Sequence, residues 1–287
     1  MESMKWMIVT DSSCDLRTKE LQEPDVAYVN VPFLLTLDGK DYSDDEQLNI
    51  PEMVDAMEVS KASHSACPSP GAWAEKFAQA DQVIAVTISG NLSGSYGSAM
   101  AARDMVLEAY PEKKIEVIDS LATGPKLVMI VQQAIRQISE HMSFERVCES
   151  ARELAQNVKT VFTLTSFHNL VQNGRVGRLA GFIAGKLGIR VIGIGTKEGQ
   201  IHFKGLVRGE KKALRSIVND MEENGYTGKP MAISQCLNPK LAEELKRMIL
   251  EKWQNAAVQI FPTKGLDSYY AERNGLIISY PLAPSRS

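Results

Sequence analysis

The chain has 287 residues, of which 44% are hydrophobic and 23% are charged, a composition typical of a soluble globular protein with room for two domains. A formal net charge of −3 and a pI near 5.9 argue against a broad nucleic-acid-binding surface. The four cysteines are far apart and form no CxxC pair, so a reducing, cytoplasmic environment is expected rather than a zinc or disulfide framework. No uncharged apolar run is long enough for an integral membrane segment.

In the first half of the chain, apolar runs alternate with stretches of helical periodicity. Apolar side chains at every second position predict a strand across residues 26–37, and the following Asp38-Gly39 is typical of a hairpin turn. Further strands are predicted at residues 6–9, 83–88 and 114–118. Helices are predicted at residues 51–59, 70–80, 95–109, 123–140 and 143–157. This alternation favours an N-terminal domain over residues 1–157, with a mostly parallel sheet flanked by helices.

The second half of the chain, residues 158–287, is predicted to form a C-terminal domain. Its expected strands lie near residues 160–165, 190–196, 200–207, 231–235, 257–261 and 276–280. Its expected helices lie near residues 167–172, 209–224 and 239–253. Paired hairpin strands beside helices are typical of an α+β sheet, so we expect an α/β protein of two domains.

Two serine-rich turns carry most of the chemical information. One spans residues 63–71 (SHSACPSPG), and the other, residues 89–96 (SGNLSGSY), follows a predicted strand. Each is predicted to lead into a helix N-terminus, where unpaired backbone N–H groups and the helix dipole favour a negative ligand. Because neither turn contains lysine or arginine, their hydroxyls and amides suit one weak negative charge, such as a carboxylate, better than a polyphosphate.

Ser93 is the main candidate in the second turn. Its position predicts a helix N-cap, but Gly90 and Gly94 on either side would also let the backbone approach a ligand closely. The same two interpretations apply to Ser65 and Ser69 in the first turn. Both a capping role and a binding role therefore stay open for these serines.

An enzymatic interpretation is also open. Asp11 follows the first predicted strand, where α/β folds place ligand groups, although it is equally suited to cap a helix at residues 16–22. Asp119 has the same position after another strand. If both carboxylates held a metal, the serine turns would serve a small phosphorylated substrate.

The basic residues form two further candidate segments. Arg175 and Arg178 are suited either to clamp an anion or to provide surface charge. The glycines at 177, 181 and 185 recur every four residues and so share one helix face, which would allow either tight helix packing or contact with a bound alkyl chain. Arg208 opens the segment RGEKK, which either docks a partner or forms a solvated helix start. The four histidines show no metal-binding spacing.

Several of these segments together resemble the DegV family, in the family's order through most of the chain. The opening IVTDSSCDL at residues 8–16 resembles the family start IVTDSxxDL, and CPSPG at 67–71 and SGNLSGSY at 89–96 resemble its serine-containing segments. Residues 117–120 (VIDS), 174–177 (GRVG) and 208–213 (RGEKKA) resemble the segments VIDS, GGRIG and RGRKKA.

This resemblance implies a cytoplasmic bacterial protein whose two α/β-type domains enclose one long-chain fatty acid in an apolar tunnel. It implies a carrier with no catalytic activity, metal or cofactor, which presents the fatty acid carboxylate to a fatty acid kinase. The hydroxyls of Ser65 and Ser93 would bind the carboxylate, with Gly94 and Arg175 beside them, and Arg208 would contact the kinase.

One segment departs from the family pattern. Many members have a histidine that contacts the carboxylate within a C-terminal GTHTGPGALG segment, where this chain has residues 265–275 (GLDSYYAERNG). Tyr270 is nearest to the place of that histidine and is therefore expected in the site. A phenol donates a hydrogen bond but is not a cation near neutral pH.

Overall fold

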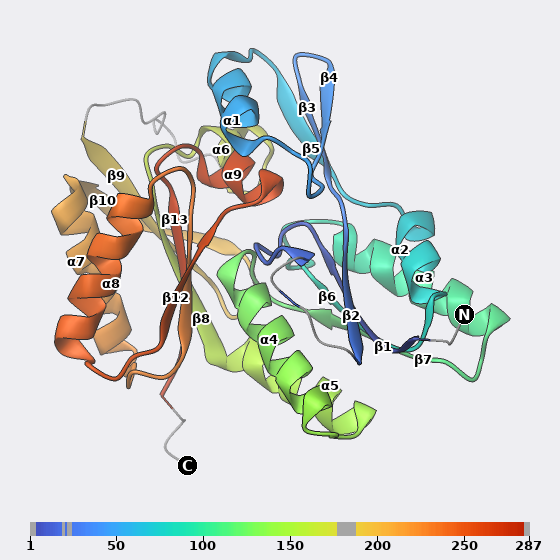
Figure 1. Ribbon diagram of the computed structural model, residues 1–287. Helices are drawn as coiled ribbons and strands as arrows, with labels where there is room; N and C mark the ends of the chain where they lie inside the picture. Colours follow the sequence, from blue (N-terminus) through green and yellow to red (C-terminus); the bar gives the residue numbers. More distant parts are fainter. Residues whose placement is uncertain (1–3, 19–20, 22–24, 177–187, 284–287) are drawn as a thin grey trace.

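The computed structural model describes residues 4–18, 21, 25–176 and 188–283 (Figure 1). Its first sheet is parallel and has the strand order β2-β1-β6-β7. The strands are β1 (Met4–Asp11), β2 (Val26–Val31), β6 (Ala80–Thr87) and β7 (Lys114–Asp119). The central strands β1 and β6 are almost continuously buried, as expected for a parallel sheet with helices on both faces.

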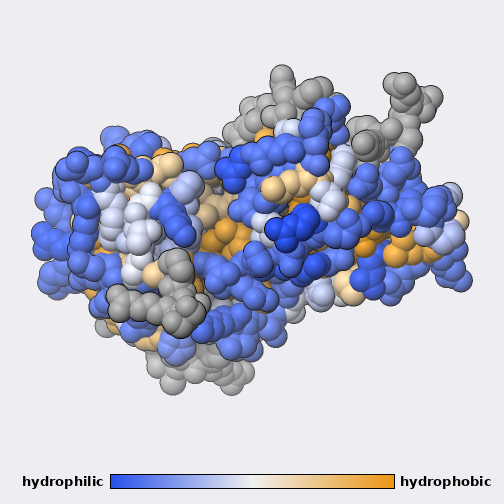
Figure 2. Space-filling view, turned by 90° about the horizontal axis from the view of Figure 1, so that it is seen from below, coloured by the Kyte–Doolittle hydropathy of each residue, from blue (hydrophilic) through white to orange (hydrophobic). Residues whose placement is uncertain are grey.

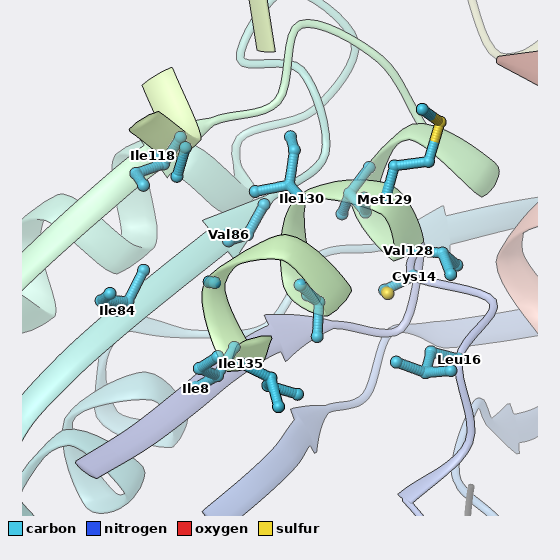
Figure 3. Packing of buried hydrophobic residues seen from close by; sticks show 14 of the residues in the cluster. Ile8, Cys14, Leu16, Ile84, Val86, Ile118, Val128, Met129, Ile130 and Ile135 are labelled. Atoms are coloured by element: carbon cyan, nitrogen blue, oxygen red, sulfur yellow. The ribbon is translucent and has the colours of Figure 1, made fainter. Parts of the chain in front are cut away.

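Four helices cover this sheet, two on each face. The helices α2 (Pro70–Phe77) and α3 (Ser95–Ala109) pack on one face, and α4 (Pro125–Ser139) and α5 (Phe144–Asn157) pack on the other. Figure 3 shows the second interface, where isoleucines of α4 lie over Ile8, Ile84 and Val86 of the strands. The opposite side of α4 contacts β11 (Met231–Gln235) and β13 (Leu276–Pro281) of the second large sheet. Because α4 lies between two sheets, residues 125–131 in its first half are all buried, whereas its second half carries polar side chains such as Gln133 and Arg136.

A small antiparallel sheet has the order β4-β3-β5. Its strands are β3 (Leu34–Leu37), β4 (Lys40–Ser43) and β5 (Ser63–Ala66), with α1 (Ile50–Val59) between the last two in sequence. The prediction of one strand over residues 26–37 is wrong, because β2 ends before Pro32, which has no N–H for pairing. The Asp38-Gly39 turn is confirmed, with positive φ values of 48° and 84° as a type I′ hairpin requires.

The second large sheet is mixed and has the order β10-β9-β8-β13-β11-β12. Its strands are β8 (Val158–Leu164), β9 (Ile189–Gly195), β10 (Ile201–Arg208), β11 (Met231–Gln235), β12 (Val258–Pro262) and β13 (Leu276–Pro281). The helices α7 (Glu210–Glu223) and α8 (Pro239–Lys252) cover one face. The short helices α6 (His168–Gln172) and α9 (Gly265–Ala271) pack on the other side, toward α1 and the small sheet (Figure 1).

The predicted fold class is confirmed: a parallel sheet flanked by helices is followed by a mixed sheet with helices. The expected boundary between residues 157 and 158 falls where α5 ends and β8 begins. The sequence pattern does not predict β5 or α9, and the helix expected over residues 70–80 is shorter because Ala80 begins β6. Figure 2 shows hydrophilic side chains over most of one face, with hydrophobic atoms in the recesses between them. Among the helices of the described chain, none is both long and apolar enough to cross a bilayer.

Candidate functional site

Four of the predicted site residues line one cavity. Ser65, Ser93, Arg175 and Tyr270 come from β5, the loop before α3, the loop after α6, and α9. We call this space the head cavity. Its full lining is Phe33, Ser65, Ile88, Leu92, Ser93, Thr123, Leu170, Arg175, Ile201, Leu266, Asp267 and Tyr270. The fold thus brings together polar side chains that are far apart in the sequence.

Two serine–tyrosine pairs attach α9 to β5. Ser65 Oγ lies 2.8 Å from the hydroxyl of Tyr270, and Ser63 Oγ lies 2.7 Å from the hydroxyl of Tyr269. Residues 63 and 65 project from the same face of β5 because side chains alternate along a strand. The Ser63–Tyr269 pair is buried, whereas Ser65 and Tyr270 are half-buried and line the head cavity. One pair therefore serves packing, and the other presents hydroxyls to the cavity.

Ser93 lies two residues before Ser95, the first residue of α3. The prediction that Ser93 is the N-cap is wrong: Gly94 is the N-cap, with φ and ψ of −69° and −2°. Ser93 Oγ still accepts a long hydrogen bond of 3.3 Å from the N–H of Ser95, which leaves its proton available to a ligand. A Cβ on Gly94 would lie 3.4 Å from Cys67 Sγ, so the two serine-rich segments meet here.

The first serine-rich segment is not wholly a loop, because residues 63–66 form β5. Ser69 is the N-cap of α2, and its Oγ accepts a hydrogen bond of 3.3 Å from the N–H of Ala72. The two serines therefore differ: Ser69 caps a helix at the surface, and Ser65 faces the head cavity.

Asp11 fixes the loop that carries Ser93. Its Oδ2 accepts hydrogen bonds from the N–H of Ile88 (3.1 Å) and the hydroxyl of Ser95 (2.6 Å), and its Oδ1 accepts from the N–H and hydroxyl of Ser13. Complete burial raises the pKa of Asp11, and these hydrogen bonds oppose that shift. The expectation that Asp11 caps a helix at 16–22 is wrong, since the described residues 16–18 and 21 are not α-helical.

The carboxylate of Asp119 is also engaged. Its Oδ2 accepts from the N–H of Gly90 at 3.1 Å, and its Oδ1 accepts from the N–H of Leu121 at 2.8 Å. Asp11 and Asp119 therefore act as loop anchors in the described structure. Within residues 4–18, 21, 25–176 and 188–283, no three His, Cys, Asp or Glu side chains are placed to hold a metal ion.

Arg175 provides the positive charge that the two serine-rich segments lack. Its Nε donates to the carbonyl of Leu92 at 3.2 Å, and its Nη1 donates to the carbonyl of Asn173 at 2.6 Å. The guanidinium carbon lies 5.7 Å from the centre of the Tyr270 ring, within cation–π range. Arg175 thus connects the Ser93 loop to α9 at the edge of the head cavity.

A second, apolar cavity continues from the first, and we call it the tail cavity. The two share Leu92, Thr123, Leu170, Ile201, Asp267 and Tyr270. The other residues that line the tail cavity are Leu121, Ala122, Thr160, Phe162, Leu164, Gly195, Gly199, Gln200, Ala271 and Ile277. The volume open to the centre of a water molecule is about 60 Å³ in the tail cavity and 40 Å³ in the head cavity. Such small values fit a narrow channel, in which only the region along the axis is open to a water centre.

The β9–β10 hairpin closes against the Ser93 loop. Gly199 at its turn has a φ of +77°, and a Cβ there would lie 2.2 Å from Ser89 Oγ. The side-chain amide of Asn91 donates to the carbonyl of Glu198 at 2.6 Å. No local sequence signal predicts this contact, which joins the two large sheets beside the tail cavity.

A wider hollow, of about 610 Å³, lies between α4, α5 and the adjacent ends of the mixed-sheet strands. Its lining mixes apolar side chains, such as Met129, Leu154 and Met231, with the polar side chains of Gln132, Gln133, Arg136, Asn157, Lys229 and Gln259. Although it is the larger space, this mixed lining suits an alkyl chain less well than the almost wholly apolar tail cavity does.

The remaining predicted residues lie elsewhere. Arg208 is exposed at the end of β10, roughly 23 Å along the strand from Ile201, which lines both cavities. Arg178 and the glycines at 177, 181 and 185 lie outside the described residues. Gly94 is close to Ser93 but is not among the residues that line the cavities.

These features define a class of protein: an α/β protein in which a narrow apolar cavity between two large sheets begins at a cluster of hydroxyls and one guanidinium. The family model described as "Uncharacterised protein, DegV family" matches residues 5–274. The chain therefore belongs to the DegV family, which confirms the resemblance seen in the sequence.

Relatives and solved structures support the same assignment. A DegV domain-containing protein of Streptococcus pyogenes serotype M3 is 37% identical over 280 residues, which cover 97% of this chain and 100% of that protein. The crystal structure of the Streptococcus pneumoniae Fatty Acid Kinase (Fak) B3 protein, loaded with linoleic acid, is 35% identical with a TM-score of 0.94 and covers 98% of this chain and 100% of that chain. A DegV family protein from Eubacterium eligens, loaded with heptadecanoic acid, is 36% identical with a TM-score of 0.91, at 97% and 100% coverage.

Proposed function

We propose that this chain binds one long-chain fatty acid, with the carboxylate in the head cavity and the alkyl chain in the tail cavity. The observation that carries the proposal is the continuity of an apolar channel with a polar mouth formed by Ser65, Ser93, Arg175 and Tyr270. Burial of about 14 methylene groups at roughly 0.8 kcal/mol each gives near 11 kcal/mol before ordering costs. The fatty acids bound by the Streptococcus pneumoniae and Eubacterium eligens proteins support this ligand class.

In this proposal the head cavity orients the carboxylate through neutral donors and one cation. Burial raises the pKa of Tyr270, although the Ser65 hydrogen bond and the Arg175 charge oppose the shift. The phenol therefore stays protonated at neutral pH and donates to the carboxylate. Ser65 and Ser93 supply hydroxyl donors, Gly94 next to Ser93 is proposed to contribute its N–H, and Arg175 balances the negative charge.

Extraction of the purified protein with organic solvent, followed by mass spectrometry, tests the ligand directly. We expect one long-chain fatty acid per chain, and native mass spectrometry should show lower occupancy in Ser93→Ala. The matched control is Ser69→Ala, which removes the cap of α2 and costs about 1 kcal/mol of stability without touching the cavity. Equal occupancy in Ser93→Ala and the unmodified protein would contradict the assignment of the head cavity.

We further propose that the chain is a non-catalytic, cytoplasmic carrier of two domains, residues 1–157 and 158–287, that presents the carboxylate to a fatty acid kinase. Support comes from the Fatty Acid Kinase (Fak) B3 protein, which has the same fold and 35% identity. The exposed Arg208 is the proposed kinase contact.

Phosphorylation of bound oleic acid by an added fatty acid kinase and ATP tests this partner. We expect Arg208→Glu to lose most of the phosphorylation while it retains the lipid. Arg247→Glu, on the exposed side of α8, is the charge-matched control and should behave like the unmodified protein. Phosphorylation that is equally fast in Arg208→Glu would argue against this docking contact.

A further inference from the structure

A cluster of buried charged groups holds the start of α9 against the first half of the chain. Asp15 Oδ1 accepts a hydrogen bond of 2.7 Å from the N–H of Lys264. The two oxygens of Asp44 accept from the N–H groups of Gly265 (2.6 Å) and Leu266 (2.7 Å). Within α9, Asp267 Oδ1 accepts a hydrogen bond of 2.5 Å from the hydroxyl of Thr123. Every one of these contacts joins residues before position 124 to residues after position 263.

Four polar atoms of this cluster are buried without a hydrogen-bond partner in the described part of the chain. They are Asp15 Oδ2, Asp267 Oδ2, Lys264 Nζ and Ser234 Oγ, of which the Ser234 hydroxyl acts to lower the pKa of Asp15. The two carboxyl oxygens converge on Gly124, since a Cβ there would lie 2.6 Å from Asp267 Oδ2 and 3.0 Å from Asp15 Oδ2. The side chain of Lys264 is 1% exposed and interacts electrostatically with both Asp15 and Asp44. The unpaired oxygens thus face one another across the junction.

Two adjacent carboxylates cannot both stay ionised away from water. Burial raises the pKa of Asp15 to about 6, and burial together with the charge of Asp15 raises the pKa of Asp267 well above its usual range. One proton held between them would join the two unpaired carboxyl oxygens by a hydrogen bond and remove one negative charge.

The surrounding titratable groups do not compete for this proton. Burial raises the pKa of Cys14 to about 12 and that of Cys236 to about 11, so both thiols stay neutral. Asp44 has a pKa raised by burial but accepts two backbone hydrogen bonds. The ammonium of Lys264 opposes the negative charges of Asp44 and Asp15.

We propose that Asp15 and Asp267 share one proton, and that this proton positions α9, and with it Tyr270, over the head cavity. Asp15 and Asp267 are then positioning residues for fatty acid retention, and this role rests on the proposed function. Asp267 is suited to it because it lines both cavities and lies on the same short helix as Tyr270. When α9 separates from the first half of the chain, the two carboxyls part, the proton leaves, and the mouth of the channel opens.

A shared proton makes the docking of α9 depend on pH with a definite sign. When α9 is docked, Asp15 and Asp267 hold one proton between them. When α9 separates, both carboxyls are exposed, have pKa values near 4 and release that proton at higher pH. Docking of α9 is therefore favoured at low pH. The stabilisation that the shared proton gives to docked α9 declines as pH rises from about 4 through the raised pKa values of the pair. Each pH unit in this range can shift the docking equilibrium by up to tenfold, so fatty acid release quickens between pH 6 and 8.

Transfer of oleic acid from the loaded full-length chain to phosphatidylcholine vesicles measures this release. We expect the rate to rise severalfold between pH 6 and 8 in the unmodified protein and to be nearly constant in Asp267→Asn. The asparagine keeps the Thr123 contact and donates to Asp15 without a titrating proton. Asp267→Ala, which removes both contacts, should release oleic acid quickly at every pH. The control Asp104→Asn, on the exposed side of α3, should keep the unmodified profile.

Hydrogen exchange of the amides in residues 264–271 gives a second, lipid-independent measurement. At pH 8 these amides should exchange more slowly in Asp267→Asn than in the unmodified protein, and the difference should shrink toward pH 6. Asp15→Asn should show the same effect and replaces Asp267→Asn if that variant does not fold. Identical exchange and identical release profiles in all three proteins would overturn the shared proton. A chain that takes up no oleic acid at any pH would instead refute the proposed function, while the exchange data would still decide the shared proton.

Discussion

Tyr270→Phe is the sharpest test of the head cavity because it removes one oxygen atom and keeps the ring beside Arg175. In the free protein the lost hydroxyl lies 2.8 Å from Ser65 Oγ. In the complex it would donate to the fatty acid carboxylate. A hydrogen bond to a charged group contributes about 1.5 to 3 kcal/mol, so we expect the dissociation constant for oleic acid to rise about 10- to 150-fold. Isothermal titration of delipidated protein measures this change.

The neighbouring tyrosine is a matched control. Tyr269 has a fully buried hydroxyl, 2.7 Å from Ser63 Oγ and 2.8 Å from Asn173 Nδ2, and does not line either cavity. Tyr269→Phe leaves those two partners unsatisfied and should lower the free energy of unfolding by about 1 to 3 kcal/mol, with little change in oleic acid affinity. Equal affinity losses in both variants would show that α9 acts only as a scaffold and that Tyr270 does not bind the head group.

Three further substitutions test other parts of the structure. Gly195→Val, in the lining of the tail cavity, should shift extracted fatty acids toward shorter chains by mass spectrometry. Gly199→Ala forces a Cβ into Ser89 at a φ of +77° and should lower the unfolding free energy by about 1 kcal/mol or more. Asp220→Asn should cost about 3 kcal/mol in urea unfolding, because it breaks a buried ion pair. The Asp220 carboxylate accepts hydrogen bonds from Lys159, Lys204 and Tyr280. Burial acts to raise the pKa of Asp220, but these hydrogen bonds outweigh it and lower the pKa. The ionised carboxylate therefore stabilises the fold above about pH 4. Below that pH, the difference in unfolding free energy between the unmodified protein and Asp220→Asn should shrink.

Local signals in the sequence predict much of the fold. The helix expected at residues 95–109 has these bounds in the structure, and the strand expected at 114–118 differs from β7 by one residue. In both cases the deciding information is short-range: a serine- and glycine-rich turn before a helix, or an alternating apolar run before a polar loop. The Asp38-Gly39 hairpin is predictable for the same reason, since two adjacent residues with positive φ specify the turn.

The site is only partly predictable from such signals. Each of the two serine-rich segments is recognisable alone, but the sequence cannot distinguish Ser65 from Ser69, because the cavity also needs residues more than 100 positions away, such as Ile201 and Tyr270. The strand β5 has only four residues, of sequence SHSA, and pairs with β3 across the 25 intervening positions 38–62. Pairing with an apolar partner strand, rather than its own β-propensity, defines it.

The helix α9 shows why long-range contacts limit prediction, and why they matter for the proposed function. It has seven residues and no side-chain cap of its own. Its first N–H groups instead donate to distant carboxylates: Lys264 donates to Asp15, 249 positions away, and Gly265 donates to Asp44, 221 positions away. A helix this short is unstable in isolation, so it forms only where the first half of the chain supports it. The head cavity needs α9 for Tyr270, and docking of the two halves is therefore thermodynamically linked to fatty acid binding: whatever favours the docked α9 must also favour the bound lipid.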